Sequence, residues 1–268
     1  MAAIAPATAT EEAVLLRRDA DGIATLTLNR PAQFNALNGE LLAALQVELE
    51  RIENDASVRV VILAGSGKAF CPGHDLKEMR SNHSRAFIEG LFRQCSRVML
   101  TLSRIPQPVI ARVHGIATAA GCQLVAQCDL AVAAADARFA TSGINVGLFC
   151  ATPGVPLSRN VPRKRAMEML LTGDFVDAHT ALEWGLVNRV VPAGELDAAV
   201  AELAQKIKSK TPVAVAAGKR MFYRQLDLGI EKAYELASET MACNMMAEDA
   251  QEGIDAFMQK RPPVWRGR

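Results

Sequence analysis

Short apolar runs alternate with helical stripes along the first two thirds of the chain. From Gly22 to Asn29, apolar residues alternate with threonine and asparagine, which is the period-2 pattern of a half-buried strand. Asn38 then precedes leucines at helical spacing and predicts a capped helix. Val58–Leu63 is mainly apolar and β-branched, and it indicates a buried strand. This succession of strands and helices predicts an α/β fold.

The alternation continues to about residue 162 and then gives way to helices. We predict a helix from Ser84 to Arg104 and strands at Val109–Val113 and Asp129–Ala134. In the last third, Val187–Val191 is the only run that resembles a strand. No internal repeat or low-complexity linker divides the chain. The predicted organisation is a disordered tail (1–12), an α/β core (13–200) and a helical C-terminal region (201–268).

Composition limits the partners and the compartment. The 268 residues carry a formal net charge of +1, so no overall field attracts nucleic acid or an anionic membrane. No apolar run reaches the roughly 18 residues of a membrane span, and the N-terminal segment resembles neither a secretory signal nor a transit peptide. The 6 cysteines form no CxxC pair and no zinc-type cluster with histidine. They predict no metal site and reduced, mostly buried thiols in a cytoplasmic protein.

Two segments, Ala64–Met79 and Val113–Leu124, each combine a strand, a tight turn of small residues and a helix. Gly65–Lys68 is not a phosphate-binding loop, because that motif needs glycine and a hydroxyl residue where Ile62 and Ala69 stand. Backbone N–H groups at the start of each helix can bind a ligand. Two such turns facing each other would form an oxyanion hole for a thioester carbonyl. Alternatively, the small residues serve only close packing of helix against strand.

The sequences AFCPGHDLKEM and VHGIATAAGCQLVAQCDLAVAAADARFA contain these two turns and resemble the signature regions of the crotonase (enoyl-CoA hydratase/isomerase) superfamily. The likeness runs from LTLNRPAQFNALN (26–38) through TPG (152–154) to EDAQEGIDAFMQKRPPVW (248–265), almost the whole chain. It implies the crotonase (ClpP-like) ββα spiral core with a helical C-terminal trimerisation region. It further implies a lyase that acts on acyl-CoA thioesters as a homotrimer or a dimer of trimers. Coenzyme A would enter as part of the substrate, with no separate cofactor.

Carried over by position, the resemblance implies that the backbone amides of His74 and Ala120 form the oxyanion hole. Two further stretches correspond to the family's adenine pocket. One lysine corresponds to a lysine near the nucleotide phosphates, and another to a C-terminal lysine that reaches coenzyme A. The resulting coenzyme A positions are Gln33, Ala36, Phe70, Pro72, Lys77 and Lys260.

The chain departs from the hydratase pattern at both catalytic glutamates, whose positions hold Gln123 and Gly143. Glutamine does not accept a proton at neutral pH, and glycine has no side chain. Since general acid–base catalysis typically contributes about 10²–10⁴-fold, we expect slow hydration at best. Three hypotheses follow. The chain performs acyl-CoA chemistry without paired carboxylates, such as decarboxylation or thioester hydrolysis; it binds acyl-CoA without catalysis; or it is a hydratase that recruits other side chains.

Other polar residues near the two turns have structural interpretations. We expect His74 to act through its amide while its imidazole is bonded locally. Asp75 is expected to cap a helix. We expect Cys122 and Cys150 to be buried, inert thiols, because no base accompanies them in the sequence. Gln123 could still orient a water molecule or a polar acyl group by hydrogen bonding.

Overall fold

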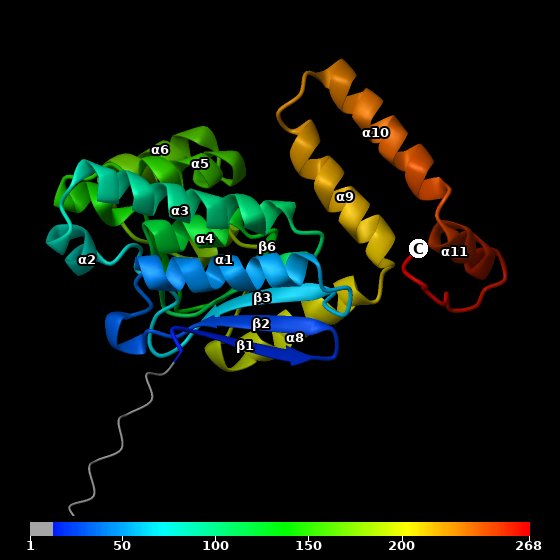
Figure 1. The fold of residues 1–268 in the computed structure, drawn as a ribbon, viewed down its shortest axis with the longest axis horizontal. Helices are drawn as coiled ribbons and strands as arrows, with labels where there is room; N and C mark the ends of the chain where they lie inside the picture. The colour runs from blue at the N-terminus through cyan, green and yellow to red at the C-terminus, as the bar shows by residue number, and fades with distance from the viewer. Residues whose placement is uncertain (1–12) are drawn as a thin grey trace, which may run out of the picture.

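The computed structural model describes residues 13–268, and within them two β-sheets are surrounded by helices (Figure 1). The larger sheet has the strand order β1-β2-β3-β4-β6-β9 and the smaller one β5-β7-β8. The strands are β1 (Leu15–Ala20), β2 (Ile23–Leu28), β3 (Val60–Gly65), β4 (Val109–Val113), β5 (Ile116–Thr118), β6 (Leu130–Ala134), β7 (Arg138–Ala140), β8 (Val176–Asp177) and β9 (Arg189–Val191).

The helices connect these strands and continue beyond the last of them. In the core they are η1 (Pro31–Gln33), α1 (Gly39–Glu53), α2 (Leu76–Ser81), α3 (Arg85–Arg104), α4 (Ala120–Gln127), η2 (Ser142–Val146), α5 (Ala151–Asn160), α6 (Arg163–Thr172), α7 (Ala178–Glu183), η3 (Ala193–Glu195) and α8 (Leu196–Lys208). Three more follow in the C-terminal region: α9 (Pro212–Gln225), α10 (Ile230–Met245) and α11 (Glu248–Met258).

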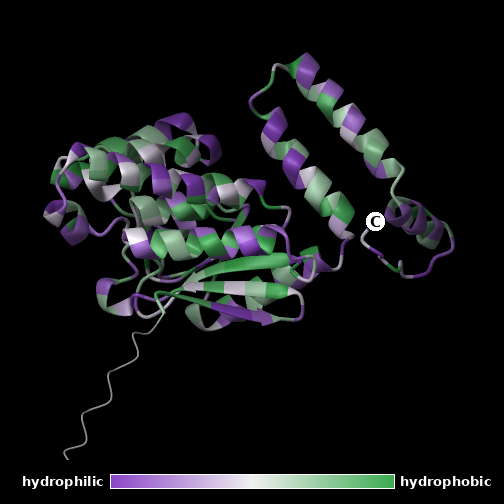
Figure 2. Ribbon diagram, viewed as in Figure 1, coloured by the Kyte–Doolittle hydropathy of each residue, from purple (hydrophilic) through white to green (hydrophobic). Residues whose placement is uncertain are grey.

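The larger sheet is parallel except for β1 and is covered on both faces, as the α/β pattern predicts. All six residues of β3 are buried, and Figure 2 shows the hydrophobic residues along this strand. Val61 and Leu63 belong to the core on the side of α1, α3 and α4, whereas Val60 and Ile62 pack with α8. Successive side chains of β3 point to opposite faces of the sheet, and both faces are covered. Every position of this strand is therefore buried, which explains its unbroken apolar sequence.

Local signals in the sequence match several element boundaries. The side chain of Asn38 accepts a hydrogen bond from the Leu41 N–H at 2.9 Å and caps α1, as predicted. The predicted helix at 84–104 and the predicted strand at 109–113 are present as α3 and β4. The expectation of one strand in the last third was wrong, because β8 also lies there. With two residues, β8 is too short to produce an alternating pattern.

The C-terminal region leaves the core after α8. In Figure 1, α9 and α10 form a helical pair that extends away from the sheets, and α11 lies at the end of the pair where α9 begins, as the hydrogen bond from the Thr211 hydroxyl to the Asp249 carboxylate requires. The predicted boundary at residue 200 falls inside α8, whose Leu196, Val200 and Ala204 pack against the sheet. The predicted tail at 1–12 lies outside the described residues.

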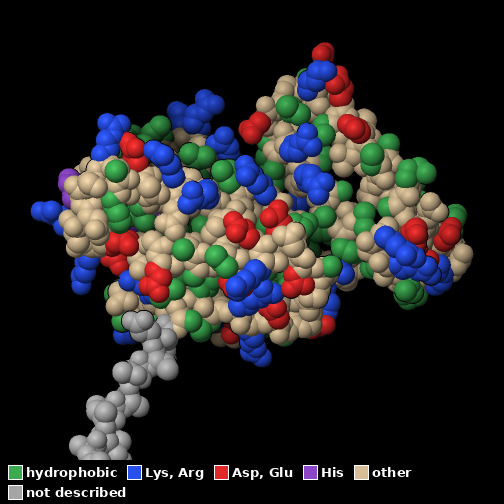
Figure 3. All heavy atoms as spheres, viewed as in Figure 1, with side chains coloured by type: hydrophobic (Ala, Val, Ile, Leu, Met, Phe, Trp, Pro, Cys, Tyr) green, Lys and Arg blue, Asp and Glu red, His purple; other side chains and the backbone are tan. Residues whose placement is uncertain are grey.

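Large apolar side chains are exposed along the C-terminal region, and Figure 3 shows hydrophobic atoms scattered over its surface. A stable monomer rarely leaves so many in one region, so these faces are candidates for contact with another chain. The most exposed are Phe222, Leu226, Ile230, Tyr234, Met241, Met246, Phe257 and Met258.

Within residues 13–268, every helix is too short or too polar to span a bilayer. The same residues contain no group of three His, Cys, Asp or Glu side chains arranged to hold a metal ion. The thiols of the chain are mostly buried, as predicted, and Cys243 is the exposed one.

A buried ion pair holds α9 against the core. The Lys219 ammonium lies 2.6 Å from the Asp129 carboxylate and also donates to the backbone carbonyls of Leu102 and Gln107 at 2.8 and 2.9 Å. The Tyr223 hydroxyl donates to the other oxygen of the same carboxylate at 2.8 Å. The ammonium therefore has three acceptors, which compensates for its removal from water.

We predict that Lys219→Met destabilises the protein by about 3 kcal/mol, because it leaves the Asp129 carboxylate buried without its cation. Urea unfolding followed by circular dichroism measures this loss. Tyr223→Phe is the matched control: it removes one hydrogen bond to the same carboxylate and should cost about 1 kcal/mol. Equal stability of wild type and Lys219→Met would show that this ion pair does not hold α9 in place.

Candidate active site

The two turns singled out in the sequence lie side by side. The Cys71 N–H donates to the Ile116 carbonyl at 3.1 Å, and the Thr118 N–H donates to the Cys71 carbonyl at 3.0 Å. The Thr118 hydroxyl also donates to the Pro72 carbonyl at 2.7 Å. These three bonds join β5, just before α4, to the turn just before α2. The segments are about fifty positions apart in the sequence, yet they form one structural unit.

Small residues make this close approach possible. A Cβ atom placed on Gly121 would lie 2.0 Å from the Cys71 carbonyl oxygen, far inside van der Waals contact. Gly73 has a φ of +107°, which favours glycine, and its added Cβ would lie 2.9 Å from the Ala119 Cβ. Ala119 itself has a φ of +48°, uncommon for a residue with a side chain. The close approach of the two turns thus fixes the position of the backbone at Ala120, the first residue of α4.

The backbone amides of His74 and Ala120 have no acceptor among the described residues. Leu37 donates to the Gly73 carbonyl and accepts from the Asp75 N–H, so the intervening N–H of His74 points away from Leu37. Ala120 is the first residue of α4, where a helix leaves its N–H groups unbonded. Both residues line the same cavity. The structure therefore brings together the two donors that the resemblance implies.

This cavity has a volume of about 410 Å³ and is mainly apolar. Its walls come from α2, α3 and the segment around η2 and the start of α5. No carboxylate, lysine or arginine of the described residues lines it. Its polar side chains are His74, Ser142, Cys150 and Thr152, and its large apolar ones are Leu76, Met79, Phe92, Val146, Leu148 and Phe149.

Gly143 lines the cavity at a point where no side chain fits. A Cβ placed on it would lie 2.5 Å from the Leu148 carbonyl oxygen and 2.7 Å from the Cys150 sulfur. The Leu148 N–H also donates to the Gly143 carbonyl at 2.9 Å, so the surrounding loop is closed by its own backbone. A glutamate could not be accommodated here without moving this backbone. The absence of the second carboxylate is therefore part of the local fold.

Gln123 does not line the cavity but lies one helical turn after Ala120. It is 3% exposed, and its Oε1 atom has no hydrogen-bond partner among the described residues. Residues three apart share a face of a helix, and side chains lean toward the helix N-terminus. The carboxamide of Gln123 is therefore buried beside the first turn of α4, and the residues that line the cavity do not include it.

The His74 imidazole packs edge-on against the Phe92 ring, with centroids 5.3 Å apart. Burial lowers the pKa of His74 to about 4, so the ring is neutral at pH 7. Both ring nitrogens are buried, and contact with the Leu37 backbone offsets part of this lowering of the pKa, so the expectation that the imidazole is bonded locally stays a prediction. A neutral, enclosed ring is poorly placed for proton exchange, which leaves the backbone amide as the chemically useful group.

Asp75 has the capping role that the sequence predicts. One carboxylate oxygen accepts from the N–H groups of Lys77 and Glu78 at 3.1 and 3.2 Å. The other accepts from the Arg30 guanidinium at 3.0 Å, so this side chain is fully committed to the fold.

The expected coenzyme A residues do not all gather in one place. Pro72 lines the cavity, while Phe70 and Ala36 are buried and offer mainly their backbone. Gln33 and Lys77 are exposed near the same end of the core. Lys260 directly follows α11, which lies at the opposite end of the molecule from α2 in Figure 1. Within one chain it does not approach the other five positions.

The cavity's apolar wall could not be predicted from the sequence. Phe92 is not among the buried residues that form the apolar face of α3, and Leu148 and Phe149 are in a loop without periodicity. The sequence does place Cys150 shortly after Gly143, the position of the second missing glutamate. No sequence feature, however, distinguishes its thiol from that of any other buried cysteine.

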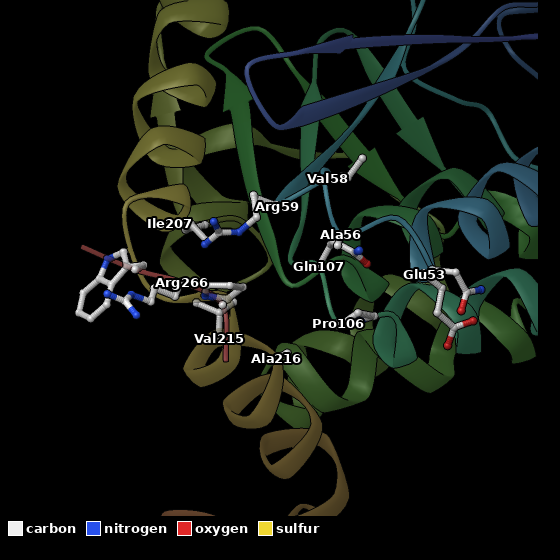
Figure 4. A pocket seen from close by; sticks show the side chains of 14 residues that line it. Glu53, Ala56, Val58, Arg59, Pro106, Gln107, Ile207, Val215, Ala216 and Arg266 are labelled. Carbon is white, nitrogen blue, oxygen red and sulfur yellow. The ribbon is translucent and has the colours of Figure 1, made fainter. Parts of the chain in front are cut away.

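A second cavity of about 500 Å³ lies between the core and α9 (Figure 4). Two of its polar side chains, those of Arg59 and Gln107, donate hydrogen bonds within the chain. The Arg59 guanidinium donates to the Lys210 carbonyl at 2.6 Å just beyond the end of α8, and the Gln107 amide donates to the Ile52 carbonyl at 2.7 Å. Both side chains tie elements of the chain together, and no oxyanion-type donor pair accompanies them.

Comparisons with known proteins agree with this geometry. A family model described as "Enoyl-CoA hydratase/isomerase" matches residues 18–268. The chain is 47% identical over 244 residues to enoyl-CoA hydratase domain-containing protein 3, mitochondrial, of Xenopus laevis, covering 91% of this chain and 83% of that protein. For this chain the cytoplasmic location remains a prediction.

Solved structures show the same fold. A structure described as enoyl-CoA hydratase of Mycobacterium smegmatis has a TM-score of 0.93 and 61% identity, with 95% of this chain and 99% of that chain covered. The human enoyl coenzyme A hydratase domain-containing protein 3 has a TM-score of 0.92 and 46% identity, covering 94% and 100%. The predicted crotonase fold is thereby confirmed.

We predict that Gly121→Ala separates the two turns, because its Cβ would overlap the Cys71 carbonyl. Overpacking of this kind typically costs about 1–3 kcal/mol, which should lower the melting temperature in a thermal scan. Gly90→Ala, which has open space around the added atom, is the control and should leave stability unchanged or raise it. A Gly121→Ala variant as stable as wild type would contradict the close approach.

Proposed function

Because the chain belongs to the enoyl-CoA hydratase/isomerase family, we propose that its cavity binds an acyl-CoA thioester. The thioester oxygen lies between the backbone amides of His74 and Ala120, which stabilise the negative charge of an enolate. The observation that carries this proposal is the pair of amides without acceptors beside an apolar cavity. Such fixed donors need no reorganisation as charge develops on the oxygen.

Efficient hydration is not the reaction we propose. Adding water to an enoyl thioester requires a group that takes a proton from water and one that supplies a proton to carbon. The cavity lining contains no carboxylate, and the two glutamate positions hold Gln123 and Gly143. Without a general base, the amides can polarise the thioester but cannot activate the water.

Decarboxylation of an α-carboxylated acyl-CoA is the chemistry best suited to this cavity. In that reaction the bond between Cα and the carboxyl carbon breaks, CO₂ leaves, and the bonding electrons pass into the enolate held by the two amides. No base is needed, since the substrate supplies the electrons. An apolar wall such as Leu76 and Phe92 keeps water from the carboxylate, which favours its loss. Thioester hydrolysis is less well supported, because it also requires an activated water.

A second candidate is acyl-CoA binding without turnover. The mainly apolar lining of the cavity favours it, because such a surface holds an acyl chain whether or not chemistry follows. In both cases coenzyme A arrives as part of the ligand, and no separate cofactor is proposed.

The oligomer we propose is a homotrimer or a dimer of trimers. Two observations support assembly: the exposed apolar side chains of the C-terminal region, and the position of Lys260 at the opposite end of the chain from α2. If Lys260 contacts coenzyme A, the cavity that it serves belongs to another copy. Assembly would also cover Phe257 and Met258, which shortly precede Lys260 in the sequence and are strongly exposed.

We predict that the purified protein binds crotonyl-CoA in isothermal titration calorimetry but hydrates it at least about 10²-fold more slowly than an ordinary hydratase. Methylmalonyl-CoA should instead release CO₂ in a coupled assay. Binding without CO₂ release from any α-carboxylated thioester would favour the non-catalytic candidate. Hydration at the rate of an ordinary hydratase would refute the argument from the missing glutamates.

The oxyanion donors can be tested by removing one N–H. Ala120 is the first residue of α4, a position where proline fits a helix, so Ala120→Pro deletes the donor while keeping the helix. Losing one such donor typically costs about 10²–10³-fold in rate. Ala120→Gly keeps the N–H and is the matched control.

In this test, infrared spectroscopy of bound acyl-CoA labelled at the thioester carbonyl reports polarisation independently of turnover. We expect the carbonyl band shift to shrink in Ala120→Pro and to persist in Ala120→Gly. The same shift in both variants would show that this amide does not bind the oxygen.

A further inference from the structure

His74, which carries one of the two oxyanion amides, lies on a backbone segment that is bonded on both sides to Leu37. The Leu37 N–H donates to the Gly73 carbonyl at 2.8 Å, and the Asp75 N–H donates to the Leu37 carbonyl at 2.9 Å. These two bonds hold the segment against Leu37. The direction of the His74 N–H therefore depends on how the turn that carries Leu37 is placed relative to Asp75.

The turn that carries Leu37 (residues 30–37) is rigid. The Arg30 N–H donates to the Asn35 side-chain oxygen at 2.9 Å, and the Asn35 N–H donates to the Arg30 carbonyl at 2.9 Å. The Asn35 side-chain amide is fully buried and donates to the backbone carbonyls of Ser66 and Ala69 at 2.8 Å each. The turn is thus a single unit fixed to the segment that follows β3.

The Arg30 guanidinium bridges this turn and the segment around His74. Its Nη1 atom donates to the Ala36 carbonyl, and its Nη2 atom donates to the Asp75 carboxylate at 3.0 Å. The side chains of Arg30 and Asp75 are only 15% and 13% exposed, so water competes little for these bonds. Because the guanidinium is a rigid, planar fork, it fixes Asp75 relative to Ala36.

Asp75 extends the bridge to α2. Its other carboxylate oxygen accepts from the N–H groups of Lys77 and Glu78 in the first turn of that helix. Burial by itself raises the pKa of Asp75, but hydrogen bonds from the Arg30 guanidinium and the Glu78 N–H outweigh it and lower the pKa. The carboxylate is therefore ionised at neutral pH and holds both the turn and the helix.

We propose that Arg30 is a positioning residue, which acts through Asp75 to hold the His74 amide where it can donate to the thioester oxygen. This inference rests on the proposed function and goes beyond it, because neither Arg30 nor Asp75 lines the cavity. The same guanidinium holds Ala36, an expected coenzyme A position, and so couples the nucleotide side of the ligand to the oxyanion amide. A misplacement of about 1 Å in such a site can cost about 10²-fold in rate.

Asp75→Asn separates the ion pair from the helix cap. Asparagine caps helices as well as aspartate does, so α2 keeps its cap while Arg30 loses its anion. Infrared spectroscopy of bound crotonyl-CoA labelled with ¹³C at the thioester carbonyl should show a smaller band shift than in wild type. Calorimetry should show little change in Kd, because the apolar cavity is unaltered. With methylmalonyl-CoA, kcat for CO₂ release should fall by about 10²-fold at an almost unchanged KM.

Arg30→Met breaks the bridge from its other end and should shrink the same band shift. Combining Arg30→Met with Asp75→Asn should shrink it no further, since both changes remove one interaction. Arg17→Met is the matched control, because Arg17 also forms partly buried ion pairs, but neither it nor its partners line the cavity. This control should lose stability and keep the band shift. Circular dichroism identifies the conditions in which each variant is folded.

The outcomes distinguish this inference from the proposed function. A band shift that shrinks in Asp75→Asn and Arg30→Met and persists in Arg17→Met supports the positioning role. A shift that persists in either site variant, or shrinks equally in Arg17→Met, overturns that role and leaves the proposed function intact. If Arg30→Met does not fold, Asp75→Asn decides alone. Absence of binding or of a band shift in wild type would refute the proposed function and this inference with it.

Discussion

The contact between Gly121 and the Cys71 carbonyl is the constraint on which the candidate site depends. A Cβ at this point would lie 2.0 Å from the carbonyl oxygen, so only glycine allows the two turns to meet. Their meeting orients the amides of His74 and Ala120 toward one cavity. Because the donors belong to the backbone, the side chain at position 120 does not have to take part. The sequence left two interpretations of the small residues open: close packing, or an oxyanion hole. The contact between Gly121 and Cys71 is compatible with both, because the same close packing directs the two amides toward the cavity.

Backbone and side-chain chemistry are separable in this fold. The backbone donors are present, whereas the positions of both glutamates hold residues that cannot act as a base. At 143 the loop has closed around the glycine: the Leu148 carbonyl and the Cys150 sulfur occupy the space next to it. Restoring a carboxylate there would require a different path for this loop. This local fold supports the proposed function, which uses the two backbone amides without paired carboxylates.

The sequence predicted features whose cause is local. Asn38 caps α1 through a bond to a residue three positions away, and the Val58–Leu63 run is buried because both faces of a central strand are covered. Long-range features required coordinates. Phe92 meets His74 only because α3 crosses the turn before α2, and β8 exists only by pairing with β7. The surroundings of the His74 imidazole likewise come from distant segments, Leu37 and Phe92.

The helix α4 links the candidate site to the C-terminal region. Its first residue, Ala120, supplies an oxyanion amide, and Asp129 follows its last turn and binds Lys219 of α9. At 1.5 Å per residue, the eight residues of α4 span about 12 Å. This short helix is held at its first residue by the contact between the two turns and near its last residue by the ion pair of Asp129 with Lys219. A displacement of α9 would pull on the end opposite the amide. Since oxyanion donors act only at hydrogen-bonding distance, the ion pair that secures the C-terminal helices also helps to define the geometry of the cavity.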